Sequence, residues 1–219
     1  MSTILEWSRQ QLWNGCLLAG IAHAIMVGEY PMMANEQSWD GFNYSVQDSS
    51  GQRGTVSFKE GCCVAAFRND NSQRINDSIE IKQYFEGADV PIIQLANEEA
   101  LQYLLDEVNG EVKPVITTAF WGKESLITND TMEVMMKNGG NLLETQVCEI
   151  PVATQYWKDV YQMNDNQVKI MLSVYEKKSE MPSQTILLSK QEVDALGIKN
   201  EDGKIESKES FAEMNIFWE

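Results

Sequence analysis

The stretch FNYSVQDSSGQRGTVSFKEGCCVAAF, residues 42–67, carries the clearest fold signal in the sequence. Apolar and polar side chains alternate over residues 42–47 and again over 55–58, and residues 62–67 form a short apolar run. Alternation with a period of two is typical of half-buried strands. Residues 48–52, between the first two strands, are the Asp, Ser and Gly types that favour turns. The sequence therefore predicts a meander of three antiparallel strands.

A helix is expected before this meander, over residues 4–28. Apolar side chains recur there close to a period of 3.6 residues, and Pro31 follows Gly28 as a stop signal. The apolar face is broad, which indicates a helix in the core. Gly15 and Gly20 weaken the helical signal but would let the helix pack closely against a sheet.

Further helices and strands are expected after the meander. The helical patterns are a short segment before Phe85 and the ranges 100–110, 129–137, 153–163 and 193–197. The strand patterns are 114–121, 168–176 and 185–188. The helix at 100–110 has the strongest local signals, since Asn97 can cap it and Gly110 can end it. Ser189 and Glu192 form a capping box for 193–197, residues 199–210 read as an exposed loop, and the aromatic end is expected to pack down.

Length and composition predict one α+β domain over residues 1–219, with a mainly antiparallel sheet packed with several helices. A chain of 219 residues with 43% apolar content can bury a core of its own. No segment has the Gly, Ser or Pro content of a flexible tether. The element pattern, a helix followed by consecutive strands and then mixed elements, is typical of the α+β class.

The four cysteines favour a reducing compartment. Cys16, Cys62, Cys63 and Cys148 show no disulfide framework, and a bond between the adjacent pair would be geometrically awkward. The start of the sequence has neither a basic leader nor an apolar run long enough to span a bilayer. We therefore expect a cytoplasmic protein without a membrane anchor.

The charge is strongly acidic, with a formal net value of −16. Residues 61–150 carry 15 acidic and 6 basic side chains, which gives −9 for that segment. Such a balance disfavours nucleic acid, because phosphate binding needs Lys and Arg. A basic protein partner would be attracted instead. The alternative is that the acidity serves solubility alone, and the sequence indicates no particular oligomeric state.

Recognised catalytic patterns are missing from the sequence. It has one histidine, His23, so any thiol mechanism would pair that imidazole with Cys62 or Cys63. Ordinary packing of these three side chains is the competing interpretation. The sequence shows no zinc or calcium ligand spacing and no phosphate-binding glycine loop. We therefore expect neither a metal nor a cofactor.

The connection between the first helix and the meander holds the strongest candidates for a partner-binding site. These candidates are Glu36, Gln37, Trp39, Asp40 and Tyr44. Loops on a rigid scaffold often carry binding groups, and indole and phenol side chains are enriched at recognition surfaces. The competing interpretation is structural: Asp40-Gly41 supplies a turn and Trp39 covers the edge of the core.

Two functional hypotheses follow from these patterns. The first is a non-enzymatic acidic binding or inhibitor protein, similar in character to a bacterial immunity protein, that recognises a basic protein partner. The second is a small hydrolase or transferase that uses Cys62 or Cys63 with His23, or the carboxylates of Glu36 and Asp40. The first needs an exposed recognition surface, and the second needs reactive groups with shifted pKa values in a cleft.

Overall fold

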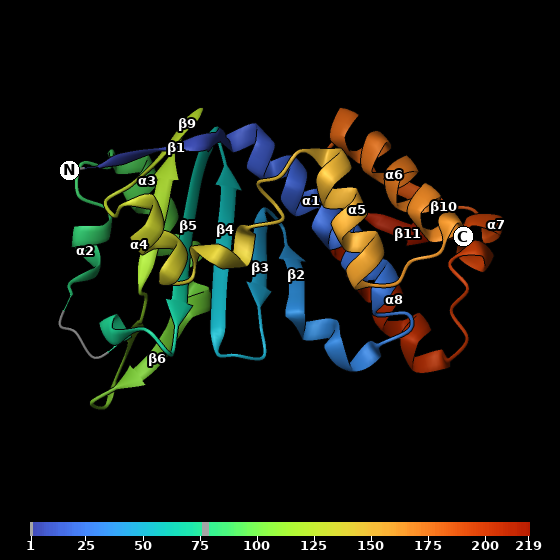
Figure 1. Cartoon of the computed structure of the whole chain (residues 1–219), viewed down its shortest axis with the longest axis horizontal. Helices are drawn as coiled ribbons and strands as arrows, with labels where there is room; N and C mark the ends of the chain where they lie inside the picture. Colours follow the sequence, from blue (N-terminus) through green and yellow to red (C-terminus); the bar gives the residue numbers. More distant parts are fainter. Residues whose placement is uncertain (1, 76–78) are drawn as a thin grey trace. The chain divides into compact units, whose positions relative to one another are not determined.

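A computed structural model describes residues 2–75 and 79–219 and confirms the α+β class, with a large antiparallel sheet packed with helices (Figure 1). The chain divides into two compact units. Unit 1 comprises Met1–Leu12 and Phe42–Glu144, and unit 2 comprises Trp13–Gly41 and Thr145–Glu219. A single domain over residues 1–219 stays a prediction.

Unit 1 is built on antiparallel strands in the order β1-β9-β8-β5-β4-β3 (Figure 1). Their bounds are β1 (Thr3–Ser8), β3 (Asn43–Gln47), β4 (Gln52–Lys59), β5 (Cys62–Asn69), β8 (Thr118–Gly122) and β9 (Ser125–Thr128). The predicted meander is therefore confirmed as β3-β4-β5. Glu60 and Gly61 join β4 to β5 with φ angles of 51° and 78°, the left-handed conformation that tight hairpin turns need.

Short helices and a small hairpin complete unit 1. They are η2 (Gln73–Ile75), α2 (Ile81–Tyr84), α3 (Val90–Glu98), η3 (Ala100–Leu104), β6 (Leu105–Val108), β7 (Glu111–Pro114), α4 (Met132–Lys137) and η4 (Gly140–Leu143). Alternate residues of β5, Cys62 and Val64, share a core cluster with Ile92 and Leu95 of α3. This alternation places Cys63 on the opposite face of the strand. Of the two neighbouring cysteines, Cys62 therefore lies beneath α3.

Several expectations for unit 1 were wrong. The first five residues of the helix predicted at 4–28 belong instead to strand β1. This strand pairs with β9, which the sequence pattern does not predict. The predicted helix at 100–110 is instead the 3-10 helix η3 followed by strand β6. Asn109 and Gly110 have φ angles of 56° and 81° and form the β6–β7 hairpin turn, so this Asn-Gly pair reverses a hairpin and does not end a helix.

Two further boundaries in unit 1 shift. The predicted strand at 114–121 is split between the end of β7 and β8. The helix expected at 129–137 is α4, whose cap is Thr131 and not Asn129 or Asp130. Asp130 instead receives two hydrogen bonds from the Arg74 guanidinium, at 2.8 and 2.7 Å, which explains why its carboxylate does not cap the helix.

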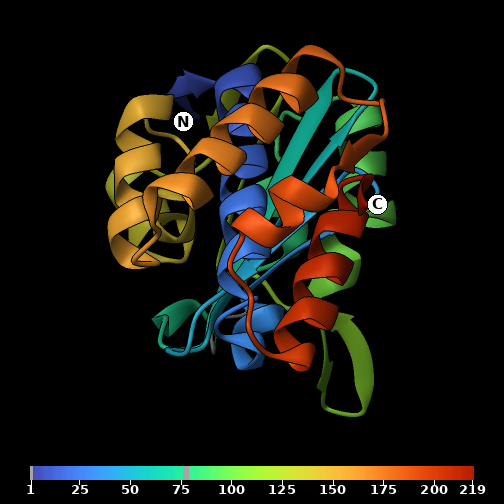
Figure 2. The ribbon, with the colours of Figure 1, turned by 90° about the vertical axis from the view of Figure 1, so that its right-hand side faces the viewer.

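Unit 2 is mainly helical. Its elements are α1 (Arg9–Met26, from Trp13 on), η1 (Pro31–Glu36), β2 (Gln37–Asp40), α5 (Ile150–Val160), α6 (Asp165–Glu180), β10 (Ile186–Leu188), α7 (Lys190–Ala195), α8 (Glu201–Glu213) and β11 (Ile216–Trp218). Figure 2 shows α8 beside α1. The Ser207 hydroxyl of α8 donates to the Ala24 carbonyl of α1 at 2.6 Å. Strands β10 and β11 pair in parallel.

Glycine allows the close approach of α1 to β2. A Cβ atom added at Gly20 would lie 2.6 Å from Nε1 of the Trp39 side chain. The indole therefore occupies the space that a larger residue on α1 would fill. The expectation that a small residue here permits tight packing is confirmed at Gly20.

Two expectations for unit 2 were wrong. The predicted strand at 168–176 lies within helix α6, where a capping box of Asn164 and Gln167 starts the helix. The loop expected at 199–210 is mostly helix α8, capped by Asn200. Both helices bury narrow faces between charged residues, and a narrow apolar face resembles either a strand or a polar loop in sequence. The helix α5, the strand β10 and the Ser189 capping box of α7 are confirmed.

Across residues 2–75 and 79–219, no helix combines the length and apolar character needed to cross a membrane.

Candidate functional site

The structure places the five predicted partner-binding residues in two environments. Gln37 and Trp39 are buried on β2, with exposed fractions of 5% and 8%, and Tyr44 is fully buried on β3 of unit 1. Glu36 is half-buried at the end of η1, and Asp40 is exposed at the end of β2. The carboxylates are thus the parts of this set that face solvent most.

Strand β2 explains this division. Side chains alternate along a strand, so Gln37 and Trp39 point inward while Ser38 and Asp40 point outward. The Trp39 backbone N–H donates to a Glu213 carboxylate oxygen of α8 at 2.8 Å. The burial of Trp39 agrees with the structural interpretation of the indole, and it leaves Asp40 at the surface of unit 2.

Gln37 connects the predicted segment to helix α5. Its side-chain amide donates to the Tyr161 hydroxyl at 3.0 Å, across 124 residues of sequence. The Tyr161 pKa is raised, first by burial and then by the charges of Glu36 and Tyr156. Glu36 is therefore close enough to Tyr161 for their charges to interact.

A ladder of aromatic rings continues from Tyr161 along α5. Tyr161 stacks on Trp157 with ring centroids 5.1 Å apart, and Trp157 meets Tyr156 edge-on at 5.0 Å. Trp157 is buried, with 6% exposed, whereas Tyr156 is 47% exposed. The ladder therefore leads from the interior of unit 2 to its surface.

Tyr156 belongs to an exposed apolar row on α5. We define the α5 row as Val152, Tyr156 and Val160, which are 58%, 47% and 52% exposed. Residues four apart lie on one face of a helix, so the three side chains follow each other along a single stripe. Ala153 and Trp157 occupy the buried face of the same helix. Helix α5 thus has one apolar face in the core and a second in solvent.

Carboxylates gather where β2 meets α8. We define the acidic cluster as Asp40, Glu209 and Glu213. Burial and the charges of Asp40 and Glu209 raise the Glu213 pKa, although the hydrogen bond from the Trp39 N–H opposes the shift. Asp40 and Glu209 are therefore each near enough to Glu213 to repel its negative charge.

The segments that carry these features are acidic as a whole. Residues 29–40 and 149–165 contain six acidic side chains and one basic one, Lys158. Lys158 pairs with Asp165 at 2.9 Å. The single cation is thus already compensated, and the remaining charge of these segments is negative.

His23 and Cys63, two members of the proposed thiol mechanism, are buried. His23 is 1% exposed, and its Nε2 donates to the Ala34 carbonyl at 3.1 Å. Burial lowers the His23 pKa to about 4, although this hydrogen bond opposes the shift. Burial also raises the pKa of the Cys63 thiol. Both shifts disfavour the charged forms that thiol activation requires. Cys62 is also buried, with 5% exposed, but it lines a pocket of unit 1.

Within the described part of the chain, no three His, Cys, Asp or Glu side chains are arranged to hold a metal ion. Comparison with protein-family models, with curated proteins and with solved structures gave no match.

Sequence reasoning did not identify the α5 row or the acidic cluster. The sequence does carry a signal for the α5 row. Ala153 and Trp157 supply the apolar face that the helix buries, and a second set of apolar residues four apart remains: Val152, Tyr156 and Val160. The acidic cluster had no such local signal, since it joins residues from distant parts of the sequence.

Proposed function

We propose that this chain is a non-enzymatic, acidic, cytoplasmic binding protein of the inhibitor or immunity kind, which recognises a basic protein through unit 2. The observation that carries the proposal is the α5 row, an exposed apolar stripe in a strongly acidic setting. Apolar side chains that stay exposed together on one helix face are typical of interaction sites.

The chemistry of this region defines the partner. Val152, Tyr156 and Val160 offer a strip of apolar contact, and tyrosine is enriched at the energetic centres of interfaces. Glu36 and the acidic cluster add negative charge in unit 2. A partner that presents apolar side chains flanked by Lys or Arg would match both properties. A basic toxin or nuclease domain has this character.

The environment of the ionisable groups also supports binding over catalysis. His23 is held neutral by burial and uses its Nε2 proton in a hydrogen bond with Ala34. Cys63 is fully buried. These groups need no catalytic role to explain their presence, since each fills space in a core.

The test is affinity capture with matched baits from cells that make the protein. The baits are the wild type, Tyr156→Ser with Val160→Ser, and Glu176→Gln with Glu180→Gln on the exposed side of α6. We expect a basic protein bound by the wild type and the α6 variant but lost from the α5 variant. Captured proteins are then purified and the binding is repeated at rising salt.

Electrostatic attraction predicts weaker binding as salt rises from about 0.05 to 0.5 M, because the Debye length falls to a few ångströms. Binding that depends on neither salt nor the α5 row would contradict the proposal, as would the absence of any basic protein specific to the wild type. Circular dichroism of each bait shows that the substitutions leave the fold intact.

A further inference from the structure

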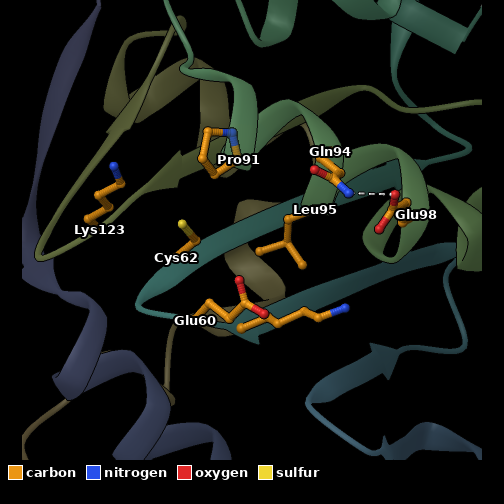
Figure 3. A pocket seen from close by; sticks show the side chains of 8 residues that line it. Glu60, Cys62, Pro91, Gln94, Leu95, Glu98 and Lys123 are labelled. Carbon is orange, nitrogen blue, oxygen red and sulfur yellow. Dashed lines mark hydrogen bonds between the residues drawn. The ribbon is translucent and has the colours of Figure 1, made fainter.

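A pocket in unit 1 lies between the β4–β5 turn, helix α3 and the β8–β9 turn (Figure 3). Its volume is about 280 Å³, close to the lower end for small-molecule sites. Cys62 and Leu95 are the least exposed of its lining residues, and Lys59, Glu60, Pro91, Gln94, Glu98 and Lys123 complete the set. This pocket belongs to unit 1 alone, so an inference from it does not depend on the partner surface proposed for unit 2.

The thiol of Cys62 points into this pocket (Figure 3). Its neighbour Cys63 is fully buried, and burial raises the pKa of that thiol. Because successive side chains of a strand face opposite ways, the two adjacent cysteines have different access to a ligand. Cys62 is only 5% exposed, but its sulfur faces the pocket, so it is positioned for reaction with a pocket ligand. Cys63 serves as the control within the same strand.

Charged groups of both signs surround the Cys62 thiol. Lys59 and Lys123 provide ammonium groups, and Glu60 and Glu98 provide carboxylates. Asp89 is the main cause of the raised Lys123 pKa, and Cys62 is near enough to contribute to the same shift. The thiolate is the form of Cys62 that attacks a disulfide.

The charged partners of the pocket are exchangeable. Lys123 pairs with Asp89 at 2.7 Å and Lys59 pairs with Glu99 at 3.4 Å, and at least one side chain of each pair is more than a third exposed. Exposed ion pairs contribute little to stability, so a ligand carboxylate could replace Asp89 or Glu99 at small cost. Glu98 accepts from Gln94 at 2.8 Å and could instead accept from a ligand ammonium group.

We propose that the pocket binds a small zwitterionic thiol compound, of the class of glutathione, and that Cys62 forms a reversible mixed disulfide with it. The Cys62 thiolate attacks one sulfur of the oxidised, disulfide form of that compound. The new S–S bond forms as the old one breaks, and the departing thiolate takes up the proton that Cys62 lost. The lysines orient the carboxylates of the compound, and the glutamates orient its ammonium group.

The test measures modification of the folded, full-length protein by oxidised glutathione, with intact mass and peptide mapping as readouts. Every protein carries Cys148→Ser, because Cys148 is the partly exposed cysteine outside the pocket. We expect one added glutathionyl group, located at Cys62, and none in a Cys62→Ser variant. Cys63 should react only after unfolding in urea.

The charge of the pocket is tested with Lys59→Gln and Lys123→Gln together. We expect the rate with oxidised glutathione to fall roughly threefold to tenfold, because the reagent loses its ion pairs with the two lysines. The rate with the uncharged bis(2-hydroxyethyl) disulfide should stay the same, since thiol access is unchanged. A control with Lys113→Gln and Lys137→Gln, which makes the same charge change outside this pocket, should behave as the wild type.

Three results would overturn the proposal. They are an absence of modification at Cys62 in the folded protein, an equal fall in rate with both disulfides, and an equal fall in the pocket and control variants. The second would assign the lysines to thiol activation alone, and the third would assign them to general electrostatic attraction of an anionic reagent.

Discussion

Helices α1 and α5 of unit 2 differ in whether they bury or expose the side chains that could carry function. Helix α1 buries its histidine, so that His23 is 1% exposed and its pKa falls to about 4. Helix α5 leaves Tyr156 47% exposed between two exposed valines. A residue type that can act in catalysis does not by itself mark an active site, because it can be buried in the core. Apolar side chains that stay exposed together do indicate a binding surface.

The adjacent residues Trp157 and Tyr156 give the largest expected contrast. Trp157→Ala removes a buried ring and should lower the free energy of unfolding by about 3–5 kcal/mol. Tyr156→Ala removes an exposed ring and one edge contact with Trp157, so the loss should stay below about 1 kcal/mol. Urea unfolding of both variants measures the two values. Equal losses would mean that Tyr156 is part of the core and would break the comparison.

The buried His23 gives the next largest effect. Its folded pKa of about 4 lies below the unfolded value of 6.5, so the unfolded chain binds the proton first. Stability from this group is complete above pH 6.5 and is lost as the pH falls toward 4, by up to about 3 kcal/mol.

The measurement compares urea unfolding of the wild type and His23→Gln between pH 7 and 4. The difference between the two proteins isolates the histidine, because the carboxylates titrate in both. We expect the wild type to lose more stability than the variant across this window. Parallel curves would show that His23 is not held neutral by burial.

The acidic cluster gives the smallest effect. Asp40→Asn removes a negative charge that raises the Glu213 pKa, so that pKa should fall. Carboxyl carbon chemical shifts followed by NMR against pH measure the change. The control Asp202→Asn, also on α8, should leave the Glu213 pKa unaltered, since Asp202 is not among the groups that shift it. If Asp40→Asn left the Glu213 pKa unchanged, Asp40 would not belong to the acidic cluster.

The part of the fold that could be predicted from sequence is the part with local signals. The β3-β4-β5 meander follows from alternation and a polar turn, and the α7 capping box follows from Ser189 and Glu192. Helix α6 was read as a strand because Val168, Ile170 and Val174 fit a period of two. The residues that α6 buries include Ile170, Val174 and Lys178, which are four apart, and Met171, and this spacing is helical.

The candidate site could be predicted only in part, because its geometry is non-local. Glu36 to Asp40 drew attention through residue type, but alternation on β2 turned Trp39 inward and left Asp40 outside. The hydrogen bond from Gln37 to Tyr161 joins positions 124 residues apart. No local pattern encodes such a pairing, whereas the excess of apolar residues on α5 is visible in the sequence once both faces of the helix are considered.

The most direct test of the account is the affinity of a captured basic partner for Tyr156→Ala, measured by calorimetry beside the wild type. The account predicts binding weaker by about tenfold or more, since exposed tyrosines at interface centres contribute upwards of 1.4 kcal/mol. The melting temperature of the variant should remain close to that of the wild type. Unchanged affinity for Tyr156→Ala would contradict the claim that the α5 row is the recognition surface.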